Sequence, residues 1–595
     1  MRFWGVLMAN SQNLAPSFCR FAWRMHERLS PERLSEEDKQ RLFEIIHALL
    51  DAMNTGEVCV DLKRVTTPET FSSIKALLLR SRLAAEGEAN DVLFVIDDND
   101  RLYLHRFYRY EVRLAQRLKA LKDHHYSLED EAFHLDSLFK SLKNKHGVDM
   151  QALAVAVAQT SALTVISGGP GTGKTWTVVK ILEALLLREP ALRIAMCAPT
   201  GKAAARMSES VRNSLNGVTE SVRARIPTKA QTVHRLLRQA DPLPYDVVVL
   251  DEASMVSLEL MARLVEHMPS RARLICLGDK DQLASVDPGA VFAELSQTFA
   301  FSAPALSRLN RLGFDTNSLK TVQNASLTQR WNLVDHTVWL THSYRFDDQK
   351  GIGRLARFVR EGLALDAVHQ LDELDDHLAY YKLDECAQGL DASVESAIVE
   401  AYRPYFKAVN AYFAKECGLE EVFVALHRFG LLCALNEGPF GVDALNDLIV
   451  RTLQVDWPMT ADGHFPGEVI MVAVNDQDLR LNNGDVGVVL KTPEGQLEAY
   501  FETVDEAGCQ TYRPIPVGRL PEYKRAFAIT IHKSQGSEYD RVMMVLPPVS
   551  KLLTRELCYT GITRAKHHLT VVATKDSIRR AVMTPTERIS GLLTR

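Results

Sequence analysis

The sequence predicts an α/β protein with two parallel β-sheets, an α+β region before the first and a small β module inserted in the second. An apolar, β-branched run at Leu163–Ser167 is followed by a glycine-rich loop and a helical stripe from Trp176 to Leu187. This order is typical of a buried parallel strand that leads into a helix. Short apolar runs then alternate with helical segments to about residue 340, and a second set of apolar runs begins near residue 431. Such alternation indicates parallel sheets covered by helices.

Residues 1–112 are expected to form an N-terminal α+β domain. Val92–Ile96 and Leu102–Phe107 alternate as strands around the turn Asp97–Asp100, which predicts a β-hairpin. The acidic turn could bind a cation, but the preference of Asp and Asn for turns explains it better. A helix over Tyr110–Lys122 is expected to lead into the next domain.

The first parallel-sheet domain is expected to span residues 113–340. Its further strands are predicted at Arg193–Ala198, Val247–Leu250 and Leu274–Leu277. Residues 315–332 are polar and aperiodic, which predicts a connection between domains.

Residues 341–595 are expected to form the second parallel-sheet domain. Its strands are predicted at Leu431–Leu435, Ala526–Ile531, Val542–Leu546 and Leu569–Thr574. Between them, residues 467–520 alternate short β runs with turns, which predicts a small all-β module. The acid-rich segment 365–400 is interpreted as solvated helix faces in preference to a metal site.

Composition limits the function. The net charge of −5 and the pI of about 6.4 exclude a global basic field, so any contact with nucleic acid must come from a local groove. Nine scattered cysteines include no Cys-x2-Cys pair, which favours a reducing compartment and argues against zinc or an iron–sulfur cluster. The apolar start, Phe3–Ala9, is short for a signal peptide, and no run of 18 apolar residues exists. A cytoplasmic protein that does not enter a membrane is therefore expected.

The glycine-rich loop is a phosphate-binding motif. Its eight residues match Gly-x4-Gly-Lys-[Ser/Thr] without a gap and are Gly168, Gly169, Pro170, Gly171, Thr172, Gly173, Lys174 and Thr175. The glycines let backbone N–H groups face the phosphates, and the following helix, from Trp176, adds its positive N-terminal end. Lys174 is expected to reach the β- and γ-phosphates, and the Thr175 hydroxyl to bind Mg²⁺. The sequence therefore predicts a nucleoside triphosphate site.

Polar residues follow two other predicted strands. Asp251 comes directly after Val247–Leu250, where an acid can bind Mg²⁺, and Glu252 can orient or deprotonate the attacking water. Gln282 follows the next strand and can sense the γ-phosphate through its amide. An Asp-Glu pair often follows a strand by chance. The prediction of a hydrolytic site therefore depends on the order and spacing of both polar segments, Asp251–Glu252 and Gln282.

A second group of polar motifs lies far downstream. Arg345 and Arg564 are each set beside an aromatic residue or a small-residue turn, and arginine suits the clamping of a phosphoryl group. Thr530–Glu538 places polar groups directly after a predicted buried strand, where loops of α/β sheets bind ligands. Outside this ordered context, an ordinary surface or ion-paired arginine would be the simpler interpretation.

Taken in order, the motifs are similar to those of superfamily 1 DNA helicases. They are Gly168–Thr175, Ala198–Lys202, Thr232–His234, Asp251–Ser254, Gly278–Gln282, Ser343–Arg345, Thr530–Glu538 and Tyr559–Arg564. Within that superfamily the chain most resembles the RecD family, the 5′→3′ motor subunits of RecBCD (exonuclease V) helicase–nucleases. The supporting stretches are Val165–Lys174, Asn436–Gly441, Leu481–Gly487 and His532–Gly536. The resemblance implies two RecA-like motor domains and an SH3-like β module.

The resemblance also implies roles for individual residues. Gln151 would read the adenine edge, Tyr344 would stack on the base, and Gly536 and Glu538 would lie near the nucleotide, Glu538 at the ribose. Lys174, Thr175, Asp251, Glu252 and Gln282 would form the hydrolytic site with ATP and Mg²⁺, and Arg345 and Arg564 would act on the γ-phosphate from the second domain. Pro199, Thr200, His234, His532 and Ser534 would line the path of single-stranded DNA. The implied partners are single-stranded DNA, DNA ends, and RecB-like and RecC-like subunits in a heterotrimer, onto which residues 1–112 would dock.

Polarity and nuclease activity are separate questions. Only Met207–Ala230 separates Arg206 from Gln231, which leaves no room for the large helical insertion of 3′→5′ relatives and supports the 5′→3′ branch by analogy. No nuclease motif stands outside the motor motifs, so nuclease activity is assigned to a partner. Two alternatives remain open: a free-standing 5′→3′ helicase, and a nucleotide switch without motor activity that regulates a partner.

Overall fold

The computed structural model describes residues 14–30, 33–126, 138–139, 143–144, 147–319, 333–373, 375–453, 459, 463–492, 494–504 and 510–594. The predicted start segment Phe3–Ala9 and residues 320–332 of the predicted connection lie outside these ranges. The described chain divides into two compact units, each treated by itself below. The first holds residues 1–280, 284–342 and 587–595, and the second holds residues 281–283 and 343–586.

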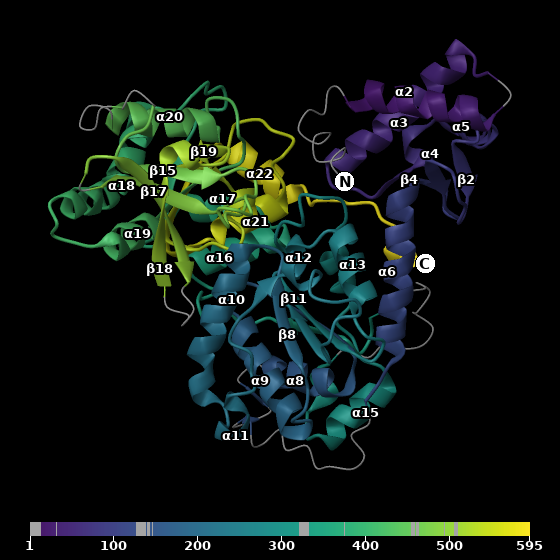
Figure 1. The fold of residues 1–595 in the computed structure, drawn as a ribbon, viewed down its shortest axis with the longest axis horizontal. Helices are drawn as coiled ribbons and strands as arrows, with labels where there is room; N and C mark the ends of the chain where they lie inside the picture. The colour runs from purple at the N-terminus through teal and green to yellow at the C-terminus, as the bar shows by residue number, and fades with distance from the viewer. Residues whose placement is uncertain are drawn as a thin grey trace. The chain divides into compact units, whose positions relative to one another are not determined.

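The first unit begins with an α+β domain, hereafter the N-terminal domain (Figure 1). Its four-stranded sheet has the order β1-β4-β3-β2, with β3 and β4 antiparallel as the predicted hairpin requires. The strands are β1 (Cys59–Asp61), β2 (Ala84–Glu86), β3 (Phe94–Ile96) and β4 (Arg101–Leu104). The helices are α2 (Leu14–Leu29), α3 (Glu36–Asn54), α4 (Leu62–Val65), α5 (Pro68–Arg80) and α6 (His105–Asp123).

The prediction of a strand as far as Phe107 is wrong, because α6 begins at His105. Phe107, Leu114, Leu118 and Leu121 are buried on one side of α6, at helical spacing. Helix α6 packs along α13 (Leu258–His267), and Arg117 donates from Nη2 to the carbonyl of Met268 at 2.6 Å (Figure 1). The helix therefore joins the N-terminal domain to the next domain.

The second part of the first unit, hereafter the first parallel domain, has a six-stranded sheet in the order β12-β7-β11-β10-β8-β9. All its neighbouring strands run parallel. The strands are β7 (Leu163–Gly168), β8 (Ile194–Ala198), β9 (Gln231–Thr232), β10 (Val247–Leu250), β11 (Arg273–Gly278) and β12 (Thr337–Leu340). The helices include α8 (Met150–Thr160), α9 (Lys174–Arg188), α10 (Gly201–Ser214), α11 (Glu220–Arg223), α12 (Val233–Leu236), α13, α14 (Val291–Leu295) and α15 (Ala303–Arg311). This confirms the predicted parallel sheet.

The second unit contains a five-stranded parallel sheet in the order β13-β22-β21-β14-β20, hereafter the second parallel domain. Its strands are β13 (Leu378–Lys382), β14 (Phe429–Cys433), β20 (Ala528–Thr530), β21 (Tyr539–Val545) and β22 (Ala565–Ala573). Its helices are α16 (Gly351–Glu361), α17 (Ala364–Asp372), α18 (Ala392–Phe413), α19 (Leu419–His427), α20 (Val442–Leu453), α21 (Arg555–Ile562) and α22 (Lys575–Met583). Within 365–400, the expectation of helix faces alone is wrong, because residues 378–382 form an edge strand.

The inserted β module is an antiparallel sheet in the order β18-β17-β16-β15-β19, which confirms the predicted all-β insertion. Its strands are β15 (Glu468–Val472), β16 (Val486–Lys491), β17 (Leu497–Val504), β18 (Gln510–Pro516) and β19 (Tyr523–Arg525). A small core of its own includes Ile470, Val489 and Phe501. The final strand extends the module five residues beyond the predicted end at 520.

Three findings bear on the predictions from composition. The eight cysteines in the described ranges are all thiols outside any disulfide. Within the same ranges, no group of three or more His, Cys, Asp or Glu side chains is arranged to hold a metal ion. None of the described helices combines the length and apolar character needed to cross a bilayer.

Candidate nucleotide-binding site

The phosphate loop connects β7 to α9 in the first parallel domain. Gly171 and Gly173 adopt φ values of +77° and +81°, which residues with a side chain rarely adopt. The two left-handed residues turn the backbone between the strand and the 15-residue helix, so that successive N–H groups can line a concave surface at the helix N-terminus. This is the backbone form that suits a phosphate group.

Lys174 folds back over this loop. Its Nζ donates to the carbonyl of Gly168 at 2.6 Å and to that of Gly169 at 3.2 Å. The Thr172 hydroxyl donates to the Gly169 carbonyl at 2.8 Å, which closes the loop from the other end. The ammonium group is therefore held within the loop.

Gln151, predicted to read the base, lies at the same loop. Asp149 caps α8 by accepting from the N–H groups of Gln151 and Ala152, which fixes the start of that helix. From there the Gln151 side chain donates to the carbonyl of Thr172 at 3.2 Å. Trp176, the third residue after Gly173, packs its ring edge-on against the ring of Phe139, with the two centroids 5.9 Å apart.

The strand order brings the predicted acids to the edge of the sheet that carries the loop. Strand β11 lies between β7 and β10, and Asp251 directly follows β10. Glu252 adopts φ +50°, and its N–H donates to Oδ1 of Asp251 at 2.8 Å. Burial, and then the neighbouring Glu252 carboxylate, raise the pKa of Asp251 to about 6, while Lys174 opposes the rise. A cation at this carboxylate would offset that desolvation.

Sequence reasoning assigned no role to several further residues at this edge. Arg206 on α10 acts electrostatically on Asp251 and lowers its pKa. Asp279 is buried directly after β11, and Ser167 accepts from the N–H of Lys280 at 3.2 Å. Asp279 lies inside the motif Gly278–Gln282 quoted above, so its place after a buried strand was a signal that could have identified it.

Gln282 belongs to the second unit with its two neighbours, residues 281–283. Within that unit the N–H of Leu283 donates to the Thr560 hydroxyl at 2.9 Å. The Gln535 side chain donates to the Leu283 carbonyl at 2.7 Å. The structure thus groups the segment of Gln282 with the motifs Thr530–Glu538 and Tyr559–Arg564.

Arg345 and Glu538 form an ion pair inside the second unit, with Nη2 and Oε2 2.8 Å apart. The Ser343 hydroxyl accepts from the N–H groups of Arg345 and Phe346, which shapes the turn that carries the arginine. Tyr344, predicted to stack on a base, is 67% exposed. An exposed aromatic ring is a group on which a planar ligand can stack.

Arg564 is buried and bonded to its own unit. Its guanidinium donates to the carbonyl of Thr560 at 3.1 Å and to that of Ser537 at 3.2 Å. Gly536, in the same loop as Ser537, adopts φ +69°. Arg564 therefore has a structural role in addition to the catalytic one predicted for it.

The residues predicted to contact DNA fall into two groups. In the first unit, Pro199 and Thr200 follow β8, and the Thr200 hydroxyl caps α10 by accepting from Ala203 N–H at 3.2 Å. His234 lies on α12, and desolvation, together with Arg263 and Arg238, lowers the pKa of its imidazole.

In the second unit, His532 and Ser534 lie in a short 3₁₀ turn after β20. Ser534 is buried, and its hydroxyl donates to the Ile531 carbonyl at 2.7 Å, which gives it a local structural role. Between them, Lys533 donates to the Asn483 side chain at 2.7 Å and ties this turn to the β module.

The site in the first unit defines a P-loop nucleotide-binding domain, and known proteins extend this assignment. The model of an AAA domain matches residues 151–288, and that of a UvrD-like helicase C-terminal domain matches residues 525–572. The RecBCD enzyme subunit RecD of Haemophilus influenzae is 35% identical over 531 residues, 82% of this chain and 79% of that protein. RecD of Mycobacterium tuberculosis is also 35% identical, over 94% of this chain and 92% of its own length.

Two more distant similarities complete the comparison. The ATP-dependent RecD2 DNA helicase of Deinococcus radiodurans is 25% identical over 87% of this chain and 62% of its own length. A crystal structure of Bacteroides Pif1 bound to single-stranded DNA overlaps 72% of this chain and 93% of Pif1, at 16% identity and a TM-score of 0.35, too low to support a conclusion. The identity and coverage of the RecD relatives are decisive: this chain belongs to the RecD family.

Proposed function

We propose that this chain is the ATP-driven helicase subunit of a RecBCD-type complex, and that it moves 5′→3′ along single-stranded DNA while the complex processes double-strand ends for recombinational repair. The observation that carries the proposal is the first-unit site, where Lys174 is held within the phosphate loop and Asp251 follows β10, two strands away in the same parallel sheet. Membership of the RecD family supplies the biological context.

The nucleotide is ATP with Mg²⁺. The backbone of residues 168–175 binds the phosphates, Lys174 balances their charge, and Thr175 and Asp251 hold the metal ion, which neutralises charge on the transferring phosphoryl group. Two protein ligands would suffice for Mg²⁺, which in proteins is usually bound through one or two side chains together with substrate phosphates. Glu252 orients the attacking water.

The second unit provides the remaining catalytic groups. Arg345 and Arg564 stabilise charge on the phosphoryl group during hydrolysis, and Gln282 senses its presence. Gln151 contacts the adenine edge, Tyr344 stacks on the base, and Glu538 lies near the ribose. The Arg345–Glu538 pair and the placement of Gln151 beside Thr172 support these assignments.

Single-stranded DNA is contacted by Pro199, Thr200 and His234 of the first unit and by His532 of the second. Because the chain carries a net charge of −5, binding depends on a local groove that follows the backbone and tolerates any base sequence. Ser534 acts by shaping its turn, since its hydroxyl is already used there.

The partners are RecB-like and RecC-like subunits, and the compartment is the cytoplasm, at the nucleoid. The runner-up is a free-standing 5′→3′ helicase. The higher identity to RecD, 35% against 25% for the RecD2 helicase, favours the subunit.

Three measurements test the proposal. Single-stranded DNA should raise the rate of ATP hydrolysis by the purified chain, whereas equal rates with and without DNA would indicate a nucleotide switch. Unwinding should require a 5′ overhang, and unwinding only from a 3′ overhang would overturn the polarity. Affinity purification of the chain from its own cells should recover two large subunits in equal amounts, and recovery of the chain alone would favour the free-standing helicase.

A further inference from the structure

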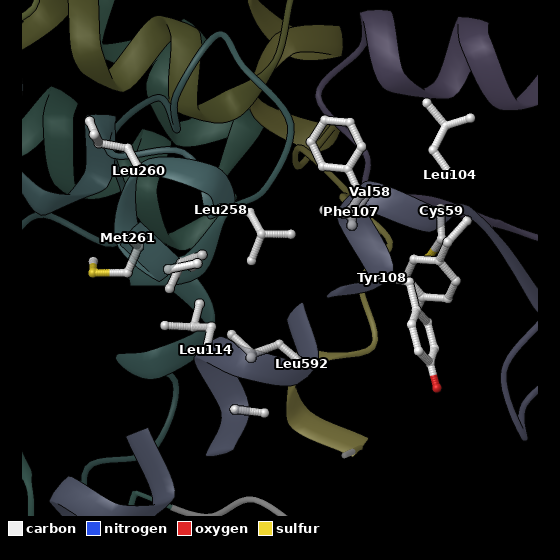
Figure 2. Close-up of a cluster of buried hydrophobic side chains, with 14 of the residues drawn as sticks. Val58, Cys59, Leu104, Phe107, Tyr108, Leu114, Leu258, Leu260, Met261 and Leu592 are labelled. Atoms are coloured by element: carbon white, nitrogen blue, oxygen red, sulfur yellow. The ribbon is translucent and has the colours of Figure 1, made fainter. Parts of the chain in front are cut away.

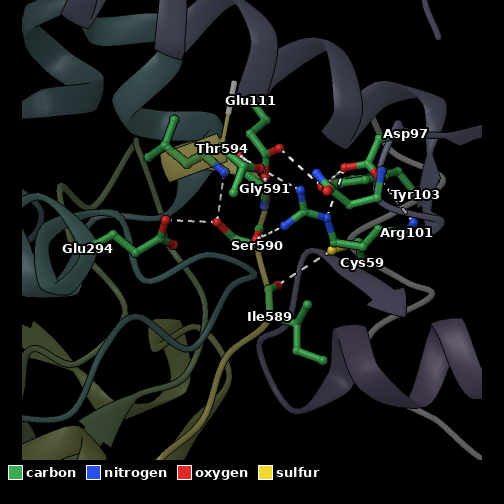
Figure 3. Close-up of polar contacts among 12 residues, drawn as sticks. Cys59, Asp97, Arg101, Tyr103, Glu111, Glu294, Ile589, Ser590, Gly591 and Thr594 are labelled. Atoms are coloured by element: carbon green, nitrogen blue, oxygen red, sulfur yellow. Dashed lines mark hydrogen bonds and ion pairs between the residues drawn. The ribbon is translucent and has the colours of Figure 1, made fainter. Parts of the chain in front are cut away.

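The last residues of the chain return to the first unit. We call residues 587–594 the C-terminal strap. They follow Thr586, the last residue of the second unit, yet they pack with the N-terminal domain and the first parallel domain. Figure 3 shows the strap passing between Arg101 and Glu111 on one side and Glu294 on the other.

Toward the N-terminal domain, the strap is bound through its backbone. The Ile589 carbonyl accepts from the N–H of Val58 at 3.1 Å, and the Ser590 carbonyl accepts from Nη1 of Arg101 at 2.7 Å. The N–H of Gly591 donates to Oε2 of Glu111 at 2.9 Å (Figure 3). Three consecutive strap residues thus bond to the residue before β1, to β4 and to α6.

Toward the first parallel domain, the strap uses side chains. The Ser590 hydroxyl donates to Oε2 of Glu294 on α14 at 2.8 Å. Arg588 donates from Nη1 to the carbonyl of Ser285 at 2.7 Å. The strap therefore bonds to both domains at once, and on the N-terminal side the Thr594 hydroxyl also accepts from Nη2 of Arg101.

The polar groups that hold the strap are removed from water. Glu111 and Tyr103 are 0% exposed, and Arg101 is kept in place by an ion pair with Asp97 at 2.8 Å. The Tyr103 hydroxyl donates to Oε1 of Glu111 at 3.2 Å, so the carboxylate that binds Gly591 is itself oriented. Buried polar groups are costly unless they are bonded, so removal of the strap would leave Glu111 without the N–H of Gly591.

The fit at Gly591 admits no side chain. A Cβ at this position would lie 2.3 Å from the Tyr103 hydroxyl oxygen and 2.5 Å from Oε1 of Glu111. Both atoms belong to buried, bonded side chains that cannot move aside cheaply. The adjacent Leu592 is 1% exposed and lies in the hydrophobic cluster that includes Leu114 and Leu258 (Figure 2).

We propose that the C-terminal strap is a built-in peptide ligand of the first unit, bound in a site formed by β1, β4, α6 and α14, and that its binding holds the sheet of the N-terminal domain against the first parallel domain. The site recognises the segment Ser590–Leu592 through the buried carboxylate of Glu111, the half-buried guanidinium of Arg101 and the hydrophobic cluster that contains Leu592. If the N-terminal domain docks onto partner subunits, as expected under the proposed function, the strap also keeps that docking surface in place.

Hydrogen–deuterium exchange on the full-length chain tests the proposal without DNA, nucleotide or partners, so its outcome is independent of the proposed function. Gly591→Ala should accelerate exchange at residues 57–61 and 101–104 by about tenfold or more, because overpacking at a buried site is destabilising. Ser590→Ala, which removes one hydroxyl and adds no atom, should accelerate exchange at the same residues by a few-fold.

Gly217→Ala is the matched control, because a Cβ there meets no atom within 4 Å. Strand β7 is the internal reference, since none of the strap's hydrogen bonds given above involves it. If exchange at residues 57–61 and 101–104 is equal in Gly591→Ala, Ser590→Ala and Gly217→Ala, the proposal is overturned. The N-terminal domain would then be held against the first parallel domain by the packing of α6 on α13. Equal acceleration of β7 would also overturn it, because the strap would then belong to a single cooperative core.

Discussion

Arg345 and Glu538, which lie 193 positions apart in the sequence, are joined by a hydrogen bond of 2.8 Å between Nη2 and Oε2. Their side chains are 24% and 11% exposed, so water screens the pair only in part. The ion pair holds the guanidinium in one orientation on a turn shaped by the Ser343 hydroxyl. A group that must act on charge in a transition state benefits from such orientation, because it then needs no reorganisation during the reaction.

Arg345→Ala should lower kcat for DNA-stimulated hydrolysis by about 10³-fold or more while the Kd for ATP changes little, because an arginine finger acts on the transition state. Glu538→Gln should lower kcat less, since the amide oxygen still accepts a hydrogen bond but the ion pair is lost. Steady-state hydrolysis and equilibrium binding of a fluorescent nucleotide distinguish the two effects.

The control for this pair is Arg354→Ala, which breaks a more exposed ion pair with Glu373 in the same unit. It should leave kcat within a factor of about two, because exposed ion pairs contribute little. A loss in Arg345→Ala that appears only as weaker ATP binding would show that the arginine is not a finger.

Arg564 should behave differently from Arg345. Arg564→Ala removes a buried guanidinium that bonds to the carbonyls of Thr560 and Ser537, so we expect it to lower the free energy of unfolding by about 2–4 kcal/mol as well as kcat. Thermal unfolding of the two alanine variants measures this contrast. An Arg564→Ala chain as stable as Arg345→Ala would show that the buried contacts are not important for the fold.

Lys174→Gln should leave the unfolding temperature nearly unchanged and lower hydrolysis by orders of magnitude, because phosphate positioning and charge stabilisation carry most of the catalysis. In this structure the lysine donates to two loop carbonyls, and the Gln amide can donate to one of them. Wild-type turnover by a folded Lys174→Gln chain would refute the assignment of the phosphate site.

Much of the fold was predictable because buried parallel strands are short apolar runs. Val247–Leu250 is β10 to the residue, and the phosphate loop lies between β7 and α9 as its motif requires. The edge strand β13 was missed because its short apolar run, Leu378–Tyr381, stands in an acid-rich segment, and only the first of these residues is buried. The sequence around Phe107 fits both a strand and a helix. The structure forms a helix there because Phe107 belongs to the row of buried residues that continues along α6.

The site was predictable where its residues are close in sequence or follow a motif. The roles given to them stay predictions, as do the domain boundaries. The local bonds of Arg564 and Ser534 could not be foreseen, because they depend on how each loop folds onto its own backbone carbonyls. The strap was invisible for another reason: Gly591 meets Glu111, a residue 480 positions away, and a segment of a few residues carries no periodicity.

Asp251→Asn should abolish hydrolysis yet stabilise the nucleotide-free chain at pH 7.5. The folded-state pKa of Asp251, about 6, lies above its ordinary value of 3.8, so the folded state binds the proton more tightly than the unfolded state. Stability from this group is therefore full below pH 3.8, declines as the pH rises, and is lost above about pH 6. The neutral amide avoids that loss, and we expect a gain of roughly 1–3 kcal/mol at pH 7.5 that vanishes near pH 4.

Urea unfolding of wild type and Asp251→Asn at the two pH values measures this difference. Addition of Mg²⁺ and ATP should stabilise the wild type more than the variant, because the carboxylate then has its cation. A variant less stable than wild type at pH 7.5 without nucleotide would show that the carboxylate is already stabilised by its neighbours, with Arg206 and Lys174 outweighing burial.

Thr200 provides the sharpest test of the DNA path, because its hydroxyl already caps α10. Thr200→Ala should lower stability by about 1 kcal/mol through loss of the cap, and any loss of DNA affinity would then have two causes. Thr200→Ser keeps the hydroxyl and the cap, so it should preserve both stability and affinity.

For wild type, log Kd for an oligonucleotide should rise with log salt at about 0.7 per phosphate neutralised, with little dependence on base sequence.

The control for Thr200→Ala is Ala203→Gly, a change in the first turn of the same helix that keeps the Thr200 hydroxyl and likewise costs about 1 kcal/mol. Thr200→Ala should weaken DNA affinity several-fold more than Ala203→Gly does. Equal affinities for Thr200→Ala and Ala203→Gly would remove Thr200 from the DNA interface and leave it as a helix cap.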